Sequence, residues 1–481
     1  MNLTTQTRRR VVVIGGGISG LAAAARLAAI HPALELTLLE AGDRLGGILQ
    51  TQRRDGYLIE RSADNFISQP PWAVDFCRRI GFADQLIPTS GEHRGALVVN
   101  RGRLVRVPEG FMLLAPARLW PLVTTPLLSP LGKLRLLCEP WVRRREGDDD
   151  ESLAGFARRR LGREAFERIV QPLSAGIYTA DPEKLSLRAT LPRFIEMERR
   201  HGSLIRGARK EQAAADAENA QQGSGARYSL FVTPREGMSS LVAAVAGSLP
   251  QGTVRLGCSA ESIAADPAGG WQVRIAGDSQ PLACDGLIVA TPAAQAARLV
   301  ANFDPVLSGE LAGIESASTA VVVLAYRREQ IGRPLDGFGF VVPAVEKRRI
   351  LSGSFSSVKF PGRAPQDAVL IRVFLGGACQ GELVDLDDRR LVQIACEELA
   401  ELISAAGAPL WSEVVRWHRA MPQYHLGHSG RVARIEQAVE HWPALALAGN
   451  AYHGVGIPHC IRSGELAAEQ VAAALATSSR R

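Results

Sequence analysis

Six residues near the amino end of the chain, Gly15-Gly16-Gly17-Ile18-Ser19-Gly20, have the G-x-G-x-x-G spacing of a turn that can approach a phosphate group. In such a turn Gly15 permits the tight bend, Gly17 leaves room for a pyrophosphate, and Gly20 lets a following helix pack closely. Glu40 follows at a distance along the chain that suits a carboxylate accepting hydrogen bonds from two ribose hydroxyls. The pattern therefore predicts binding of a dinucleotide.

The elements around this turn have the order that the motif requires. Residues 11–14 are Val and Ile, typical of a strand buried on both faces of a parallel sheet, and residues 21–30 are rich in the helix formers Ala and Leu. A second apolar strand at residues 36–39 ends directly before Glu40. Because the acid stands behind a second strand, we favour a dinucleotide site over a chance glycine-rich turn, with the phosphates at the helix N-terminus.

The residues that follow Glu40 distinguish FAD from NAD. Asp43-Arg44-Leu45-Gly46-Gly47 resembles the R-x-G-G extension that flavoproteins of the amine oxidase superfamily carry after the ribose-binding acid. In that superfamily the arginine and the paired glycines bring the backbone close to the phosphates and the ring system of FAD. The resemblance therefore implies FAD as the cofactor.

The carboxyl end of the chain supplies further parts of the same domain. Residues 445–448 predict a short strand, a turn contains Gly454-Val455-Gly456-Ile457-Pro458, and residues 461–476 have a helical pattern. The start of that helix could lie under the flavin, where the positive end of its dipole favours the negative charge of reduced flavin. We therefore expect one domain built from both chain ends, with the remaining residues inserted between them.

The middle of the chain predicts two further parts. Runs of β-branched and aromatic residues at 320–326, 339–342 and 369–374 predict a mainly antiparallel sheet, whereas residues from about 90 to 206 suggest helices with apolar patches broken by Pro. Those helices could lie on a membrane surface or cover a substrate cavity, and we weigh the two equally. The Ala-, Gln- and Ser-rich run at 208–227 predicts a mobile excursion.

The predicted fold is therefore α/β, with an FAD-binding Rossmann-like domain of the GR2 or amine-oxidase type, an inserted α+β substrate domain and a helical subdomain. The expected boundaries are 1–90, 231–300 and 430–481 for the FAD-binding domain, 91–207 for the helical, membrane-facing subdomain, 208–230 for a flexible linker, and 301–429 for the substrate-binding domain.

Composition limits the remaining functions. The net charge of +7 is spread along the chain without an aromatic-basic module, so we expect no nucleic-acid partner. An anionic substrate, an anionic lipid surface or an Arg-rich proteome would each explain the charge.

The seven cysteines form no C-x-x-C pair and predict reduced thiols in a cytoplasmic protein. The nine histidines form no H-x-x-x-H or H-E-x-x-H motif, and we predict no metal. No run approaches the roughly 18 to 20 apolar residues of a membrane span, so any membrane contact would be peripheral, on the inner face of the plasma membrane.

Five ordered segments together resemble the protoporphyrinogen and coproporphyrinogen III oxidase family over nearly the whole chain. They are Asp55 to Glu60 with Asp64-Asn65-Phe66, Pro172 to Asp181 with Leu185-Ser186, Phe360-Pro361-Gly362-Arg363-Ala364-Pro365, Arg416-Trp417 with Met421-Pro422-Gln423-Tyr424, and Gly454 to Pro458.

The resemblance implies a set of site residues. The implied FAD contacts are Gly15, Gly16, Gly17, Ile18, Ser19, Gly20, Glu40, Ala41, Arg44, Gly46, Gly47, Ile48, Ser62, Ala63, Asp64, Asn65, Ala260, Trp417, Val455, Gly456 and Ile457. Family members commonly have Gly-Pro where this chain has Ser62-Ala63. Gly176 and Tyr178 are the implied substrate-binding residues, Gly176 offering its carbonyl to pyrrole N–H groups. No residue pair demands the role of general acid or base, and no catalytic residue is assigned.

The implied reaction is the six-electron oxidation of a porphyrinogen to a porphyrin in haem biosynthesis, with O2 as acceptor and H2O2 as product. Its partners would be the porphyrinogen, molecular oxygen and, in addition, another enzyme of the haem pathway. The FAD motifs alone also fit an amine oxidase or carotenoid desaturase on the same fold, and a non-catalytic flavoprotein is a third interpretation.

Overall fold

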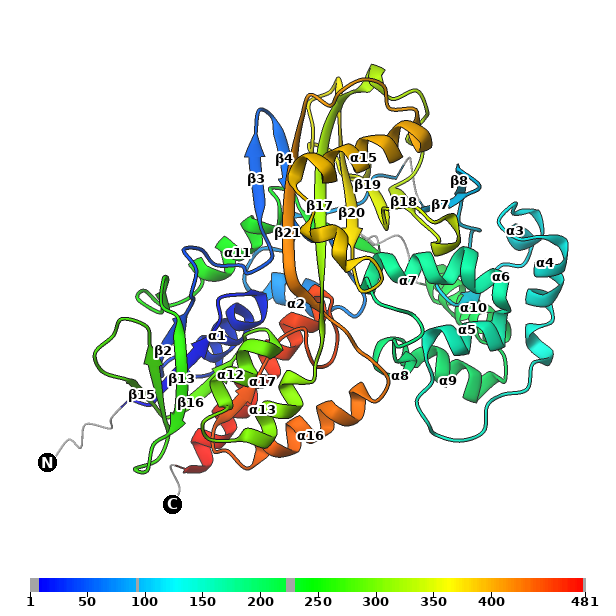
Figure 1. Ribbon diagram of the computed structural model, residues 1–481. Coiled ribbons are helices and arrows are strands. Elements are labelled where there is room, and N and C mark those ends of the chain that lie inside the picture. Colours follow the sequence, from blue (N-terminus) through cyan, green and yellow to red (C-terminus); the bar gives the residue numbers. More distant parts are fainter. Residues whose placement is uncertain (1–7, 92–94, 222–229, 479–481) are drawn as a thin grey trace, which may run out of the picture.

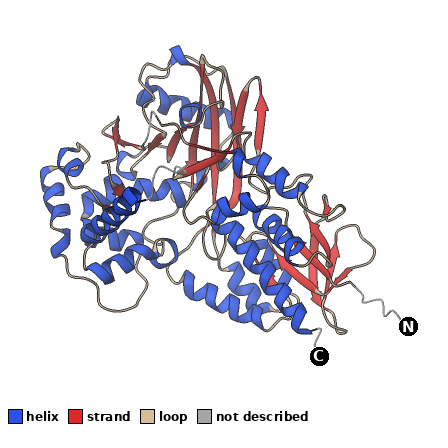
Figure 2. Ribbon diagram, turned by 180° about the vertical axis from the view of Figure 1, so that it is seen from behind, coloured by secondary structure: helices blue, strands red, loops and turns tan. Residues whose placement is uncertain are grey.

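In the computed structural model of the chain, residues 8–91, 95–221 and 230–478 are described. Figure 1 shows three regions: a parallel sheet near both termini, a large antiparallel sheet, and a group of helices beside it. Seen from behind, the helices of the third region again lie to one side of the two sheets (Figure 2). The predicted α/β class with an FAD-binding fold is confirmed.

A five-stranded parallel sheet is built from both chain ends and from the middle of the sequence. Its order is β12-β2-β1-β16-β22. The bounds are β1 Arg10–Ile14, β2 Glu35–Leu39, β12 Val254–Arg255, β16 Gly286–Val289 and β22 Leu445–Leu447. The two predicted amino-terminal strands, the strand at 287–290 and the strand at 445–448 all lie in this sheet, because each is apolar enough to be covered on both faces.

Helices cover one face of the parallel sheet, and a second layer covers the other. The first face carries α1 (Ile18–Ile30), α2 (Trp72–Arg79), α11 (Met238–Gly247) and α17 (Ile457–Ser478). The opposite face carries the antiparallel sheet β13 (Ala260–Ala265), β14 (Trp271–Ile275), β15 (Leu282–Cys284) together with α12 (Ala293–Val300), α13 (Pro305–Ala312) and α16 (His428–Glu440). Both faces of the sheet are thus buried.

The second region is a seven-stranded sheet with the order β21-β17-β20-β19-β18-β7-β8. Its strands are β7 Leu97–Asn100, β8 Arg103–Arg106, β17 Ser316–Arg327, β18 Gly339–Val341, β19 Ser352–Phe355, β20 Ala368–Gly376 and β21 Trp411–Pro422. All pairs are antiparallel except β18 with β7. Helix α15 (Asp388–Ile403) packs on one face. The hairpin β3 (Thr51–Arg54) and β4 (Tyr57–Glu60) contributes Tyr57 and Ile59 to the other.

The third region contains the helices between the two parts of the large sheet. They are α3 Trp120–Thr124, α4 Pro130–Leu137, α5 Leu153–Leu161, α6 Arg163–Ala165, a π-helical turn at Phe166–Val170, α7 Gln171–Tyr178, α8 Leu187–Thr190, α9 Pro192–His201 and α10 Leu204–Gln221. Further elements are two short strand sets, β9 Phe111–Met112 with β10 Ala115–Pro116, and β5 Phe66–Ile67, β6 Leu86–Pro88 and β11 Phe231–Pro234, and the single-turn helix α14 Ser356–Lys359.

The helical interpretation of residues 91–207 is wrong for its first part. Residues 97–106 form the β7–β8 hairpin and extend the large sheet, and the first helix of this region begins at Trp120. The turn between the strands has positive φ at Arg101 and Gly102, the backbone of a tight two-residue hairpin turn. The run Leu97-Val98-Val99 before that turn was therefore a strand signal.

The predicted mobile excursion at 208–227 is helical as far as Gln221, because α10 runs from Leu204 to Gln221, and its mobility stays a prediction. Its apolar anchors Leu204, Ile205 and Ala208 are buried and stand at or before the start of the predicted excursion. The Ala-, Glu- and Gln-rich sequence that follows has high helix propensity and can extend a helix that is anchored at one end. Residues 222–229 lie outside the described residues, and the domain boundaries stay a prediction.

Candidate active site

The glycine-rich turn between β1 and α1 contains one position that opens away from the protein. An added Cβ at Gly20 would stand 1.9 Å from the Gly15 carbonyl oxygen, and one at Gly15, where φ is +107°, would stand 2.6 Å from the Ala290 oxygen. An added Cβ at Gly17 would meet no protein atom within 4 Å. Gly15 and Gly20 are therefore required for packing, whereas the absence of a side chain at Gly17 keeps space open in front of the helix N-terminus.

Glu40 lies at the carboxyl end of β2 with its carboxylate turned toward this turn. The Gly16 N–H donates to Oε2 and the Gly42 N–H donates to Oε1, each over 2.7 Å. Each carboxylate oxygen keeps further acceptor capacity, which a pair of ribose hydroxyls could use. The Cys258 N–H donates to the Glu40 carbonyl over 2.8 Å, and this bond places Ala260, two residues further on, beside the same strand end. Ala41, Ile18 and Ser19 adjoin these groups in sequence.

The R-x-G-G segment packs directly on the turn. The Gly46 N–H donates to the Gly16 carbonyl over 2.8 Å, and Gly17 and Gly46 form a parallel bridge. Arg44 Nη2 donates to the Gly47 carbonyl over 2.6 Å, so its guanidinium binds the loop's own backbone. These bonds hold Gly47 and the exposed Ile48 next to the open space at Gly17.

The loop of residues 62–65 is tied to two other site segments. The Ser62 hydroxyl donates to the Ile48 carbonyl, and Trp417 Nε1 on β21 donates to the Arg61 carbonyl over 2.8 Å. Ala63 packs against the core beneath the parallel sheet. The side-chain amide of Asn65 donates to Asp64. The structure thus brings this loop together with the R-x-G-G segment and Trp417.

The start of α17 lies at the same end of the sheet as the glycine-rich turn. An added Cβ at Gly464 would stand 2.0 Å from the Ser19 carbonyl oxygen, so α17 and α1 are in close backbone contact. Ile457 and Ile18, the first residues of these helices, belong to the same buried cluster. Val455 and Gly456 directly precede α17, where the free N–H groups of its first turn are presented.

One polar group beside the turn has no partner among the described residues. The Thr291 hydroxyl is buried without a hydrogen bond, and its methyl carbon Cγ2 lies 3.5 Å from the position of an added Cβ on Gly15. A buried polar atom without a partner is costly. Together with the open space at Gly17 and the Glu40 carboxylate, it fits the phosphate and ribose groups of a bound dinucleotide, for which these residues could supply the contacts.

Comparison with known proteins decides the kind of dinucleotide. The family model of flavin-containing amine oxidoreductases matches residues 18–472. The chain belongs to this family. It is therefore an oxidoreductase, and its cofactor is FAD.

Three relatives extend over nearly the whole chain. A coproporphyrinogen III oxidase of Bacillus subtilis (strain 168) is 33% identical over 96% of this chain and 97% of its own length. A protoporphyrinogen oxidase of Bos taurus is 31% identical, with 96% and 98% covered. A crystal structure from Exiguobacterium sp. 255-15, provisionally assigned as a protoporphyrinogen oxidase, superposes with a TM-score of 0.84 at 29% identity and covers 97% of this chain and 99% of that one.

The predicted substrate residues of this flavin-dependent oxidoreductase lie on α7. Gly176 and Ile177 are exposed, and an added Cβ at Gly176 would stand 3.3 Å from Cγ1 of Val341. The Tyr178 hydroxyl donates to the Thr190 carbonyl over 3.2 Å, and burial raises the pKa of this phenol to about 12. Tyr178 therefore stays protonated near neutral pH.

Side chains from the predicted substrate segment and from one predicted flavin segment pack against one cluster. Leu173, Tyr178 and Val341 pack against the core of the helical region, and Val455, from the segment before α17, packs against the same core. Tyr424 is a buried member of that core. α7 and the predicted carboxyl-terminal flavin segment thus pack against one common core.

Sequence reasoning missed Tyr424 as a site residue. Its hydroxyl donates to the Asn450 carbonyl over 2.7 Å and accepts from the Gly454 N–H over 2.8 Å, which fixes the turn that leads to Val455. The His428 ring stacks on Tyr424 with ring centroids 3.9 Å apart, and its Nε2 lies 3.1 Å from the Tyr452 carbonyl. Burial lowers the pKa of His428 to about 4, so this imidazole is a neutral packing group.

Sequence reasoning also missed the residues that hold Asp64. Arg372 Nη2 lies 2.6 Å from Oδ2 of Asp64, and Lys359 Nζ lies 3.2 Å from Oδ1. Burial alone would raise the pKa of Asp64, but the charges of Arg372 and Lys359 outweigh it and keep the pKa below its ordinary value. Both cations are about three hundred positions away along the chain, so no local pattern could have paired them with Asp64.

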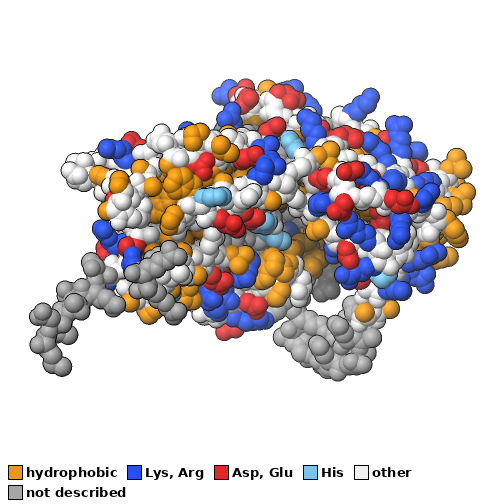
Figure 3. All heavy atoms as spheres, turned by 90° about the horizontal axis from the view of Figure 1, so that it is seen from below, with side chains coloured by type: hydrophobic (Ala, Val, Ile, Leu, Met, Phe, Trp, Pro, Cys, Tyr) orange, Lys and Arg blue, Asp and Glu red, His pale blue; other side chains and the backbone are white. Residues whose placement is uncertain are grey.

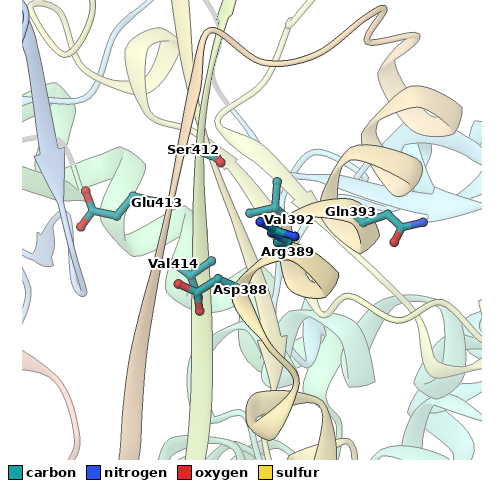
Figure 4. A pocket seen from close by; sticks show the side chains of 7 residues that line it. All are labelled: Asp388, Arg389, Val392, Gln393, Ser412, Glu413 and Val414. Carbon is teal, nitrogen blue, oxygen red and sulfur yellow. The ribbon is translucent and has the colours of Figure 1, made fainter.

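Two surface hollows lie away from the flavin segments. One lies between α15 and β21 and is lined by Asp388, Arg389, Val392, Gln393, Ser412, Glu413 and Val414 (Figure 4). Because it contains none of the predicted site residues, we assign it no role in catalysis. The second adjoins the end of α7 and includes Lys184, Gln423 and His425.

Across the described ranges, no three His, Cys, Asp or Glu side chains are grouped so that they could hold a metal ion.

Proposed function

We propose that this flavin-dependent oxidoreductase oxidises a porphyrinogen to the corresponding porphyrin, either coproporphyrinogen III to coproporphyrin III or protoporphyrinogen IX to protoporphyrin IX, in haem biosynthesis. The relatives named above carry both of these activities in their names. The observation that supports the proposal is that Leu173 and Tyr178 of α7 and Val455, from the predicted flavin segment, pack against the same core.

The protein's own residues have limited tasks in such a reaction. FAD supplies the oxidising chemistry, and the overall balance is one porphyrinogen plus three O2 giving one porphyrin plus three H2O2. In this proposal the carbonyl of Gly176 accepts from a pyrrole N–H, and Tyr178, whose hydroxyl donates to the Thr190 carbonyl, lines the substrate site. Placement of the substrate and exclusion of water are therefore the contributions of this part of the chain.

The test is an aerobic incubation of the purified protein with each porphyrinogen, following porphyrin fluorescence and peroxide. We expect fluorescence to rise with three equivalents of peroxide for one of the two substrates. Oxidation of a polyamine without turnover of either porphyrinogen would instead support an amine oxidase. A flavin that is reduced by light under argon, but is reoxidised neither by air nor by substrate, would support a non-catalytic flavoprotein.

We further propose that the end of the helical region makes peripheral contact with an anionic membrane surface. Figure 3 shows hydrophobic side chains gathered at the right-hand end of the molecule, over α3 and α4 in the orientation of Figure 1, beside many Lys and Arg side chains. The exposed apolar residues there are Trp120 (76% exposed), Val123, Leu131 (79%), Leu134 and Trp141 (78%). None of the described helices is long and apolar enough to span a membrane.

Exposed Trp and Leu side chains with Lys133 among them have the composition of an interfacial membrane contact. Vesicle flotation tests this contact with phosphatidylglycerol vesicles and neutral phosphatidylcholine vesicles. We expect the protein to float with the anionic vesicles, and Leu131→Ser to weaken this binding, while Val306→Ser, an equally exposed position on α13, leaves it unchanged. Failure of the wild type to float would contradict the proposal and leave another haem-pathway enzyme as the occupant of this surface.

A further inference from the structure

Five charged residues lie in and behind the loop of residues 62–65, four of them buried and Lys359 with a side chain 14% exposed, and we call them the buried charge cluster: Glu60, Asp64, Lys359, Arg363 and Arg372. Three come from the large sheet region and two from the segment that enters the loop. Their ion pairs therefore join the sheet region to the FAD-binding region at the predicted flavin contact.

Within the cluster, Arg372 holds the backbone of the loop. Its Nη1 donates to the Glu60 carbonyl over 3.1 Å and to the Ser62 carbonyl over 2.5 Å, while its Nη2 pairs with Asp64. A planar guanidinium with several donors suits such multiple fixed contacts. The carboxylate of Asp64 is therefore already neutralised by one ion pair, the one with Arg372.

Lys359 is a second cation on the same carboxylate. Its Nζ lies 3.2 Å from Oδ1 and 3.5 Å from Oδ2 of Asp64, and its side chain is largely buried. The same Nζ also lies 5.9 Å from the ring centroid of Phe231 and 5.4 Å from that of Phe360. Burying an ammonium group is costly, and a well-packed apolar side chain in its place is often neutral for stability. A contribution to the stability of the fold therefore does not explain why a charged lysine stands at position 359.

The remaining members leave the cluster positive. Arg363 donates to the carbonyls of Arg235 and Pro234 and to the Thr233 hydroxyl, which are neutral acceptors. Burial raises the pKa of Glu60 to about 7, so its carboxylate is only partly ionised at neutral pH. Lys359, Arg363 and Arg372 thus face the carboxylates of Asp64 and Glu60; burial lowers the pKa of Lys359, and the charge of Asp64 raises it.

We propose that Lys359 acts through this surplus positive charge, raising the reduction potential of the flavin that the loop of residues 62–65 contacts. The inference rests on the FAD site described above. Reduction adds negative charge to the cofactor, and a buried positive charge stabilises that state more strongly than an exposed one. Lys359 is therefore a charge-setting residue for the flavin and not a catalytic residue.

Anaerobic photoreduction of the FAD-loaded protein with a reference dye measures the potential directly. We expect Lys359→Met to keep FAD affinity close to wild type and to make two-electron reduction about tenfold less favourable, which is a shift of about 30 mV to more negative potential. Lys359→Arg should restore the potential. Lys210→Met, which removes an exposed charge on α10, should leave it unchanged.

Two further measurements separate charge from structure. Asp64→Asn should move the potential in the positive direction, whereas a merely structural cluster would shift both variants the same way. The shift in Lys359→Met should persist in 1 M salt, where exposed charges are screened within about 3 Å.

An unchanged potential in FAD-loaded Lys359→Met would overturn the proposal. If both Lys359→Met and Lys359→Gln lose FAD while Lys359→Arg keeps it, Lys359 holds the loop in place and the proposal is also wrong. A wild-type protein that binds no FAD would instead contradict the proposed function.

Discussion

The carbonyl oxygen of Gly15 lies 1.9 Å from the point at which a Cβ atom on Gly20 would stand, whereas an added Cβ at Gly17, on the same turn, would meet no protein atom within 4 Å. The backbone of α1 therefore lies against the end of β1 on one side of the turn. The other side, at Gly17, stays open to a ligand.

Alanine at these two positions should separate packing from cofactor binding. Gly17 has φ of −68°, which alanine adopts readily, so we expect Gly17→Ala to fold normally and to bind FAD at least about tenfold more weakly, about 1.4 kcal/mol. Gly20→Ala should destabilise the fold by about 1–3 kcal/mol, because the methyl group has no room. Thermal unfolding of the FAD-free protein and FAD titration measure the two effects. Equal loss of stability in both variants would contradict this division.

Glu60 should make stability depend on pH in an uncommon direction. Burial raises the pKa of Glu60 in the folded protein to about 7 from its ordinary value of 4.5, so the folded state retains a proton that the unfolded state releases. Stability contributed by this group is therefore fully present below about pH 4.5 and is lost as pH rises through about 7. The loss is up to about 3 kcal/mol.

Glu60→Gln isolates that contribution. The glutamine oxygen can still accept from the Met238 N–H, which donates to Oε1 of Glu60 over 2.8 Å. We expect the variant to gain stability relative to wild type between pH 5 and pH 8 in urea unfolding. A wild-type-minus-variant difference that stays flat across this range would show that Glu60 titrates normally.

Tyr424→Phe should loosen the turn before α17. The change removes both hydroxyl hydrogen bonds and leaves the Asn450 carbonyl and the Gly454 N–H without this partner. We expect a loss of about 1–3 kcal/mol in unfolding free energy and weaker FAD binding. Tyr178→Phe, which removes a single hydroxyl bond on α7, serves as the comparison and should retain FAD. Unchanged FAD affinity in Tyr424→Phe would remove Tyr424 from the flavin site.

Glu139 should be essential to the helical region. It is fully buried, pairs with the fully buried Arg160, and accepts from the N–H groups of Leu204 and Ile205 at the start of α10. Glu139→Ala would leave the buried Arg160 with only its longer ion pair to Glu198, and we expect a loss of about 3–5 kcal/mol. Glu146→Ala breaks an exposed pair with Arg143 and should change stability by less than about 1 kcal/mol in the same denaturation assay. Similar losses in the two variants would contradict the assignment.

A carboxylate at the exposed face of α7 should block the substrate and spare the cofactor. Gly176→Glu places a long charged side chain beside Val341. We expect a flavin spectrum like that of wild type with porphyrinogen turnover reduced at least about a hundredfold, near 3 kcal/mol in transition-state free energy. Gly309→Glu on α13, where an added Cβ meets nothing within 4 Å, should retain activity. Full activity in Gly176→Glu would remove the carbonyl of Gly176 from the substrate site.

The sequence predicted the parts of the fold that depend on local pattern. The strand, turn, helix and strand from Arg10 to Leu39 and the return of β16 to the same sheet follow from short apolar runs and glycine spacing. The terminal helix begins at Ile457, four positions before the expected start, because Pro458 is tolerated in a first helical turn.

Contacts between distant segments could not be predicted in this way. The helix α10 depends on Glu139, 65 positions before Leu204. The two cations on Asp64 and the Tyr424 bridge to Gly454 depend on how three regions pack, and neither residue type nor spacing indicates them. The role of the glycine-rich turn could be predicted from the sequence, because glycine acts on the backbone within a few residues of its own position.

The most direct test of the account is the flavin content of the purified protein. Denaturation should release one FAD per chain, identified by its mass and absorption, and apoprotein should take up added FAD with return of the flavin spectrum. A folded but colourless protein that takes up no FAD would contradict the account.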